Sequence, residues 1–218
     1  MSERNDHVVA DALNHPVGSG AVLGVIFAGG ASRRYGDDKA LAELGGAYLL
    51  QRVVDRIQPQ VSALAISGEK RAGFVLPTIP DELQGAGPLA ALRSVLVWAE
   101  QHEFALAMTV SCDTPFIPRN IVSVLHAALK DFDCAVVIRA GMAHPTCALW
   151  KTAARTKVET AFESGARSLH GAIDHLNAYM VDFSAARDGP GDDPFFNINS
   201  KVDMAMAQAW LDNCHVPK

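Results

Sequence analysis

Short apolar runs alternate with longer segments whose apolar residues recur every three or four positions along most of this chain. The short runs are rich in β-branched residues, as is typical of buried strands, and the longer ones have the spacing of amphipathic helices. Strands that alternate with helices indicate βαβ units and a mostly parallel sheet with helices on both faces. We therefore predict a single α/β domain over residues 21–214, preceded by a flexible extension over residues 1–20.

The alternation predicts seven strands and six helices, and it shows where functional residues are to be sought. We expect strands at residues 22–27, 63–66, 104–110, 134–138 and 178–181, shorter strands at 74–76 and 146–150, and helices at 48–57, 88–98, 118–130, 152–163, 167–176 and 202–211. Ser200 is the expected N-cap of the last helix, and residues 187–194 are expected to form an exposed loop. Ligands of parallel sheets bind beyond the carboxyl ends of the strands, so the residues after each strand are the first candidates.

The first strand ends at Gly29 and Gly30 and continues into a polar loop that contains Arg33 and Lys39. Glycines let backbone N–H groups approach an anion and cations neutralise it, so this loop favours phosphate binding. Five residues separate Gly30 from Gly36, which differs from the P-loop spacing, and the G-x-G-x-x-G pattern of dinucleotide loops is absent. The alternative interpretation is a glycine turn with solvated arginines.

Acidic residues stand at two further strand ends. Asp113 follows the strand at 104–110, where a carboxylate is well placed to hold Mg²⁺ against a triphosphate; a turn or N-cap aspartate is the alternative. Asp81 stands in an acid-then-glycine loop before a helix, where its carboxylate can accept hydrogen bonds from a base or ribose. This segment is otherwise an ordinary loop and helix start.

Asn197 and Asn199 flank Ile198, so in an extended segment both amides face the same side. They either connect loops, which is the usual role of such asparagines, or contact a ligand or metal. Arg167 follows Ser164-Gly165 and is the best candidate for a second anion, although a solvated helix face is the default for such a residue.

Composition narrows the class of protein. The chain has 218 residues, 49% of them hydrophobic, and a net charge of -5, which argues against a general nucleic-acid-binding surface. No apolar run reaches the roughly 18 residues needed to span a membrane, and the N-terminus lacks the basic-then-apolar order of a signal peptide. The four cysteines lack CxxC or zinc-ligand spacing, so we expect reduced, mostly buried thiols in a cytosolic protein. No Ser-His-Asp or Cys-His nucleophile system stands out, and His144 is given no catalytic role.

Five motifs in order resemble those of the molybdenum cofactor guanylyltransferases: AGGASRRYGDDKAL, DELQGAGPLAAL, SCDTPFIP, HPTCALW and FFNINSKVDM. The resemblance implies a three-layer Rossmann-like nucleotidyltransferase fold with a mostly parallel central sheet. It implies GMP transfer from GTP to the terminal phosphate of molybdopterin or Mo-molybdopterin in the cytoplasm, with Mg²⁺, or alternatively Mn²⁺, as the metal. Other cofactor-synthesis proteins and apo-molybdoenzymes are implied further partners.

The resemblance also implies roles for individual residues. They are Phe27, Ala28 and Gly29 on the guanine and ribose side, Arg33 and Lys39 at the GTP phosphates, Asp81 at the base or ribose, Asp113 on Mg²⁺, Asn197 and Asn199 on the phosphate or acceptor side, and Arg167 near the pterin. Arg33, Lys39 and Asp113 form the expected catalytic set. The chain departs from the family where Phe27 replaces the usual Leu, Tyr35 the usual Met, and Ser67 a frequent Asn.

Two kinds of alternative function remain open from the sequence. The first is a related nucleotidyltransferase with another nucleotide or acceptor, such as a molybdopterin cytidylyltransferase. The second is a non-catalytic GTP-binding partner, against which the presence of Lys39, Asp81 and Asp113 argues.

Overall fold

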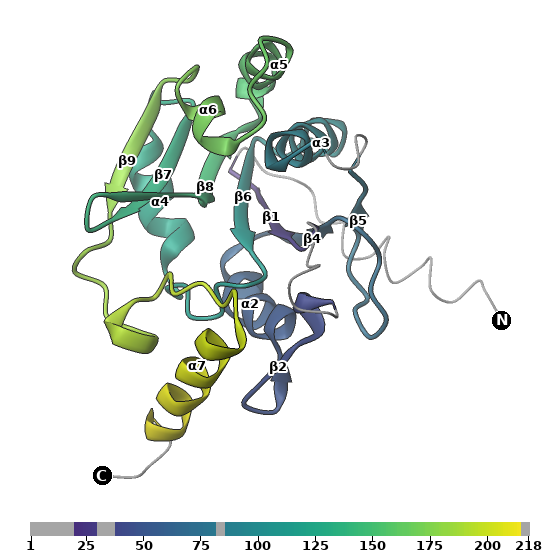
Figure 1. Ribbon diagram of the computed structural model, residues 1–218. Helices are drawn as coiled ribbons and strands as arrows, with labels where there is room; N and C mark the ends of the chain where they lie inside the picture. Colours follow the sequence, from purple (N-terminus) through teal and green to yellow (C-terminus); the bar gives the residue numbers. More distant parts are fainter. Residues whose placement is uncertain (1–19, 30–37, 82–85, 215–218) are drawn as a thin grey trace, which may run out of the picture.

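The computed structural model describes residues 20–29, 38–81 and 86–214. The strands of its main sheet are β1 (Val22–Phe27), β4 (Ala63–Ser67), β5 (Thr78–Ile79), β6 (Leu106–Ser111), β7 (Cys134–Arg139), β8 (Met142–Lys151) and β9 (Ala178–Asp182). They lie in the order β5-β4-β1-β6-β8-β7-β9 (Figure 1). Every pairing is parallel except those of β8, which runs antiparallel to both β6 and β7. The predicted mostly parallel sheet is therefore confirmed.

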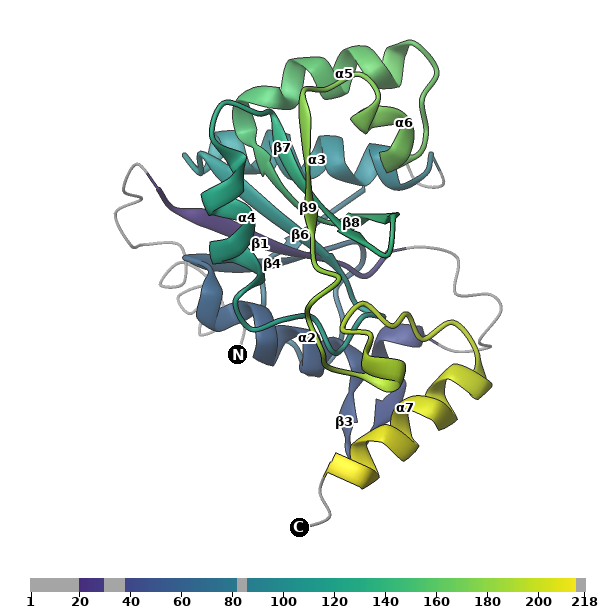
Figure 2. The ribbon, with the colours of Figure 1, turned by 90° about the vertical axis from the view of Figure 1, so that its left-hand side faces the viewer.

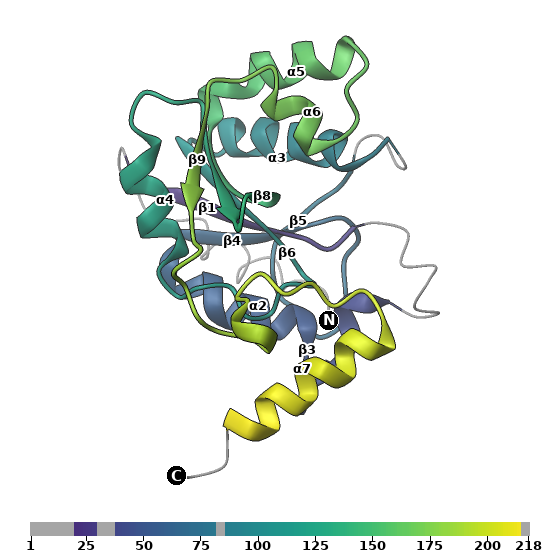
Figure 3. The same ribbon diagram turned by 60° about the vertical axis from the view of Figure 1, so that its left-hand side comes forward.

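Helices cover both faces of this sheet. The apolar sides of α2 (Leu49–Ile57) and α4 (Ile121–Leu129) pack against one face. Those of α3 (Pro88–Gln101), α5 (Arg155–Glu163) and α6 (Leu169–Ile173) pack against the other. In Figure 3, α3, α5 and α6 gather above the strands and α2 lies below them. Each fully buried aliphatic side chain in these layers contributes roughly 1.5–3 kcal/mol.

A third apolar cluster, which we call the C-terminal cluster, lies beside α2. The last helix, α7 (Lys201–Cys214), packs there near a small antiparallel ribbon of β2 (Glu43–Leu44) and β3 (Ala47–Tyr48), as Figure 2 shows. The buried members of the cluster are Leu44, Leu49, Phe116, Ile198, Ala207 and Leu211. The 3-10 helices are η1 (Lys39–Leu41), η2 (Gln58–Gln60), η3 (Thr152–Ala154) and η4 (Pro190–Asp192). The cluster joins α7 to residues 44 and 49 from the first half of the chain.

Several predicted elements differ from the structure. The short strand expected at 74–76 is wrong: Val75 is exposed, and the strand forms at Thr78–Ile79, where the chain can pair with the end of β4. The helix expected from Pro118 begins at Ile121, and the one expected over 167–176 spans only Leu169–Ile173. The loop expected at 187–194 contains η4 and buries Pro190, so it is only partly exposed.

The predicted extension at 1–20 lies almost wholly outside the described residues. Among those that are described, no helix has the length and apolar character needed to cross a bilayer.

Candidate active site

The carboxyl ends of three parallel strands stand level at one edge of the sheet. Phe27 of β1 is in register with Ser67 of β4 and with Ser111 of β6. The residues that follow these strands therefore meet at one place, as the sequence predicted from the general rule for parallel sheets.

Lys39, Asp113 and Asn199 come together at this edge. The Lys39 Nζ lies 2.7 Å from Asp113 Oδ2 and 2.7 Å from Asn199 Oδ1. Only 12% of the Lys39 side chain and 15% of the Asp113 side chain are exposed. The three residues come from η1, the turn after β6 and the segment before α7, so their meeting is a product of the fold. We call them the Lys39 cluster.

The start of α7 holds Asn199 in place. The Asp203 Oδ2 accepts hydrogen bonds from the Asn199 N–H at 2.9 Å and from the Ser200 N–H at 2.8 Å. The Ser200 Oγ in turn accepts the Asp203 N–H at 3.1 Å, which confirms Ser200 as the N-cap. The hydrogen bond from the Ser200 hydroxyl, with these backbone bonds, lowers the pKa of Asp203. Asn197 and Asn199 are exposed on either side of buried Ile198, as the alternation predicted.

One carboxylate oxygen of Asp113 is unpaired within the part of the chain that the structure describes. Its Oδ1 is buried and has no hydrogen-bond partner among the described residues. A buried carboxylate oxygen without a partner is costly, so the arrangement favours a further ligand such as a cation. The described residues contain no group of three His, Cys, Asp or Glu side chains that could hold a metal. Magnesium suits such a site because it takes one or two protein carboxylates and completes its shell with phosphates and water.

A second group of residues lies where the ends of β1 and β4 approach each other. Gly68 has φ +114°, and a Cβ added there would lie 3.0 Å from the Gly29 N. A Cβ on Gly29 would lie 3.0 Å from Asp81 Oδ2, and the Ser67 hydroxyl donates to Asp81 Oδ1 at 3.3 Å. Glycine is favoured at position 68 because of its positive φ and the close Gly29 backbone, whereas a side chain at position 29 would crowd the Asp81 carboxylate. The predicted residues Gly29 and Asp81 are therefore neighbours.

Phe27 and Ala28 already use backbone groups within the protein. The Phe27 carbonyl accepts the Cys112 N–H at 3.1 Å, and the Ala28 N–H donates to the Ser67 carbonyl at 3.1 Å. The Ala28 carbonyl accepts a 2.6 Å bond from Arg71 Nη2. A nucleotide that binds these backbone groups would therefore have to share them with the hydrogen bonds that they already make within the protein.

Arg167 lies in different surroundings from the Lys39 cluster. Its Nη1 donates to the carbonyls of Phe162 and Ala166, both at 2.8 Å, and its guanidinium stacks on the Phe162 ring at 4.3 Å. Its own carbonyl accepts the Leu89 N–H at 3.2 Å, and a Cβ on Gly87 would lie 2.7 Å from that carbonyl. These contacts place Arg167 beside the start of α3. Arg33 and Tyr35, also singled out in the sequence, lie outside the described residues.

Cys112 is buried and His144 is half-buried. Burial, followed by the Asp113 charge, raises the pKa of the Cys112 thiol to about 12, so this thiol is protonated at neutral pH. Burial lowers the pKa of His144, whose ring packs 5.1 Å from the Phe195 ring. The prediction of mostly buried, reduced thiols is confirmed, since Cys112, Cys134 and Cys147 are buried and only Cys214 of the four is exposed.

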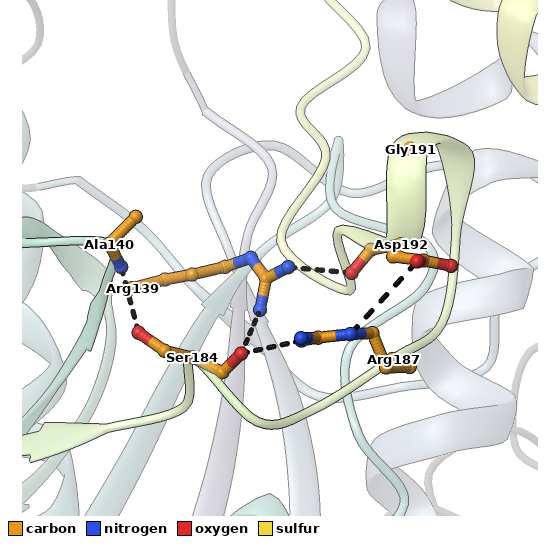
Figure 4. Close-up of a pocket in the computed structure, with 6 residues that line it drawn as sticks. All are labelled: Arg139, Ala140, Ser184, Arg187, Gly191 and Asp192. Atoms are coloured by element: carbon orange, nitrogen blue, oxygen red, sulfur yellow. Dashed lines mark hydrogen bonds and ion pairs between the residues drawn. The ribbon is translucent and has the colours of Figure 1, made fainter.

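A hollow of about 250 Å³ lies at the carboxyl end of β7 and is lined by Arg139, Ser184, Arg187 and Asp192, among others (Figure 4). Its arginines serve the protein itself. Arg139 donates to the carbonyls of Phe183 and Asp192 at 3.1 and 2.7 Å. These bonds hold the segment after β9 in place, so few N–H donors of Arg139 remain for a ligand.

Comparison with known proteins identifies the family. A sequence model of the MobA-like NTP transferase domain matches residues 24–178. The molybdenum cofactor guanylyltransferase of Mesorhizobium japonicum is 37% identical over 202 residues, which cover 88% of this chain and 97% of that protein. The chain belongs to the MobA-like NTP transferase family. This chain is also similar to the molybdenum cofactor guanylyltransferase of Rhizobium leguminosarum bv. trifolii. The two are 35% identical over 201 residues, which cover 90% of this chain and 96% of that protein.

Solved structures share the fold of this MobA-like NTP transferase. Molybdopterin-guanine dinucleotide biosynthesis protein A from Archaeoglobus fulgidus superimposes with a TM-score of 0.71 at 20% identity, covering 88% of this chain and 99% of its own. The 2-C-methyl-D-erythritol 4-phosphate cytidylyltransferase of Thermus thermophilus gives 0.62 at 18% identity, covering 86% and 98%. The predicted Rossmann-like nucleotidyltransferase fold is confirmed, and the chain is a nucleotidyltransferase by family.

The structure of this MobA-like NTP transferase also shows a residue that the sequence interpretation missed. Arg71, in the loop between β4 and β5, pairs with Asp38 at 2.6 Å and lies against the end of β1. The expectation that ligands bind beyond the carboxyl ends of parallel strands also applies to this loop, because it follows β4. The local sequence Glu69-Lys70-Arg71 resembles a solvated charge run, and nothing in it singles out the arginine.

Proposed function

We propose that this MobA-like NTP transferase transfers GMP from GTP to the terminal phosphate of molybdopterin or Mo-molybdopterin. The products are molybdopterin guanine dinucleotide and pyrophosphate. The Lys39 cluster carries the proposal, because it combines a cation, an amide and a carboxylate with a buried oxygen that no described residue contacts by a hydrogen bond. Gly29 and Asp81 follow strands that end at the same edge of the sheet, so this one edge could bind both the phosphates and the base of the nucleotide.

The reaction needs positioning and charge compensation more than a protein nucleophile. The terminal phosphate of the acceptor attacks the α-phosphorus of GTP, a P–O bond forms, and the bond to the departing pyrophosphate breaks. Lys39 and Arg33 neutralise the phosphates, and Asn199 orients the phosphate under attack. Asp81 accepts hydrogen bonds from the base or ribose, next to Gly29. The buried Cys112 thiol agrees with a route that has no covalent enzyme intermediate.

Asp113 is the proposed ligand of Mg²⁺, with Mn²⁺ as an alternative. Its Oδ1, which has no hydrogen-bond partner in the described ranges, and the neighbouring Asn199 Oδ1 are hard oxygen donors of the kind that Mg²⁺ prefers. The bound ion would supply positive charge to the triphosphate and to the leaving pyrophosphate. Lys39, which donates to both Asp113 and Asn199, then has the phosphates as its alternative partner.

The acceptor side is proposed around Arg167, Asn197 and Asn199. Arg167 has an exposed side chain next to the start of α3, and Asn197 is exposed beside the Lys39 cluster. A pterin phosphate is an anion, so an exposed guanidinium and amide donors suit it. Cytoplasmic location and transfer of the product to apo-molybdoenzymes remain predictions of the family resemblance.

Measurement of pyrophosphate release tests the proposed reaction. The purified protein is incubated with molybdopterin, Mg²⁺ and, separately, GTP, CTP, ATP or UTP, and the dinucleotide is identified by mass spectrometry. We expect turnover with GTP. Turnover with CTP alone would indicate a cytidylyltransferase, and GTP binding without pyrophosphate release would indicate a non-catalytic partner.

Two aspartate variants test the site. Asp113→Ala is expected to abolish turnover. Asp133→Ala is the matched control, because Asp133 is also paired with a lysine at 2.7 Å and is similarly buried, at 17% exposed. Full activity of Asp113→Ala in Mg²⁺ would refute the metal assignment.

A further inference from the structure

We infer that Arg71 is a positioning residue that holds Asp38, and through it Lys39, at a set distance from the end of β1. The inference rests on the proposed role of Lys39 in the transfer reaction. Arg71 itself need not touch the substrate for this function.

The guanidinium of Arg71 joins three segments of chain. Its Nε donates to Asp38 Oδ2 at 2.6 Å and its Nη2 donates to the Ala28 carbonyl at 2.6 Å. Its Nη1 donates to the Glu69 carbonyl at 3.0 Å. The side chain of Arg71 is only 9% exposed, whereas that of Asp38 is 37% exposed. A planar fork with donors in fixed directions can hold a carboxylate and a carbonyl together, which a lysine ammonium does less well.

Asp38 passes this restraint to Lys39. Asp38 is the N-cap of η1, and its Oδ1 accepts the Ala40 N–H at 3.1 Å. Lys39 is the first residue of this three-residue helix, so its backbone position follows from that of Asp38. Polar contacts therefore connect the end of β1 through Arg71 to Asp38, the backbone connects Asp38 to Lys39, and the Lys39 Nζ contacts Asp113 after β6.

The contacts favour positioning over direct phosphate binding. All three guanidinium nitrogens of Arg71 donate to the carboxylate of Asp38 or to a backbone carbonyl. These bonds use four of the five guanidinium N–H groups, so to bind phosphate with two N–H donors Arg71 would have to give up at least one of them. An exposed ion pair contributes roughly 0–1 kcal/mol, but the deep burial of Arg71 and its bond to the end of β1 distinguish it from such a pair.

The first test follows the position of Lys39 without requiring catalysis. Acetylation of Lys39 by acetic anhydride is followed by peptide mass spectrometry in the full chain. We expect Lys39 to be acetylated several-fold faster in Arg71→Ala and in Asp38→Ala than in the wild type. Arg139→Ala is the matched control, because Arg139 also binds a carboxylate and backbone carbonyls and is 15% exposed, at another strand end. An unchanged Lys39 rate in Arg71→Ala overturns the inference.

The second test is kinetic. Misplacement of a group by about 1 Å can cost around 100-fold in rate, so we expect kcat to fall about 10- to 100-fold in Arg71→Ala. The KM for GTP should change much less. The double variant Arg71→Ala/Asp38→Ala should be no slower than either single variant, because both remove the same link. Added guanidinium ion should restore part of the activity of Arg71→Ala.

The outcomes separate this inference from the proposed function. A raised KM with an unchanged kcat, or losses that multiply in the double variant, would overturn the positioning role. Wild-type protein that releases no pyrophosphate refutes the proposed function, while the acetylation of Lys39 still decides the role of Arg71. Should Arg71→Ala fail to fold, Asp38→Asn, which alters an exposed side chain, is subjected to the same two measurements.

Discussion

Replacement of Lys39 by methionine should increase the affinity of the free protein for a divalent cation. The Lys39 ammonium lies 2.7 Å from Asp113 Oδ2, next to the carboxylate oxygen that has no partner among the described residues. A metal ion that binds Asp113 must therefore displace this ammonium or share the carboxylate with it. Methionine has a similar length and no charge, so Lys39→Met removes the competitor and leaves the carboxylate available.

The size of the effect follows from the bond that the metal must replace. A hydrogen bond to a charged group contributes about 1.5–3 kcal/mol, and about 1.4 kcal/mol corresponds to a tenfold change in affinity. With both side chains mostly buried, solvent screens this bond only in part. We expect Lys39→Met to bind Mn²⁺ about 10- to 100-fold more tightly than the wild type in the absence of nucleotide.

Electron paramagnetic resonance of free Mn²⁺, recorded without nucleotide at low salt, measures this affinity directly. Lys157→Met is the matched control, because Lys157 also pairs with an aspartate, Asp133, at 2.7 Å. A non-hydrolysable GTP analogue should narrow the difference between wild type and Lys39→Met, since the phosphates offer Lys39 another partner. Equal or weaker Mn²⁺ binding by a folded Lys39→Met protein without nucleotide would refute the reasoning.

Three further predictions concern separate features. Asp113→Asn keeps the shape of the side chain but should lower kcat at least about 100-fold, because charge stabilisation at the phosphates is lost; pyrophosphate release measures it. Gly68→Ala should destabilise the fold by roughly 1–3 kcal/mol, because its φ of +114° disfavours alanine and the added Cβ would lie 3.0 Å from the Gly29 N; an unchanged urea midpoint would contradict this. The pKa of Asp203 is lowered by the Ser200 hydroxyl, so its contribution to stability is present above the ordinary aspartate value and is lost as pH falls below about 4. The difference in thermal midpoint between wild type and Asp203→Asn should therefore shrink with acidification, and a constant difference would count against it.

The sequence predicts the strands of the central sheet better than their directions. Residues 22–27 are all buried in β1, as the unbroken apolar run indicated. The antiparallel course of β8 depends on a tight turn at Ala140-Gly141, where both residues have positive φ. An alanine does not predict such a turn, since non-glycine residues seldom adopt a positive φ. Direction in this half of the sheet therefore could not be predicted from periodicity.

Part of the candidate site could likewise be predicted from the sequence and part could not. Lys39, Asp113 and Asn199 were identified because each follows or precedes a predictable element, and the fold brings the Lys39 Nζ to 2.7 Å from an oxygen of each of the other two. Arg71 was missed because its importance comes from the Ala28 carbonyl and Asp38, which lie 43 and 33 positions away. A single sequence provides residue types and local spacing, but it does not provide partners at such separations.

The contact between Lys39 and Asn199 has a consequence for biosynthesis. These residues are 160 positions apart, and the neighbouring Ile198 lies buried in the C-terminal cluster with Leu211. A chain still emerging from the ribosome can form β1, α2 and most of the sheet before residue 199 exists. We therefore expect the nascent protein to fold early and to acquire its complete site only when α7 is released, so that chains that end before residue 199 remain inactive.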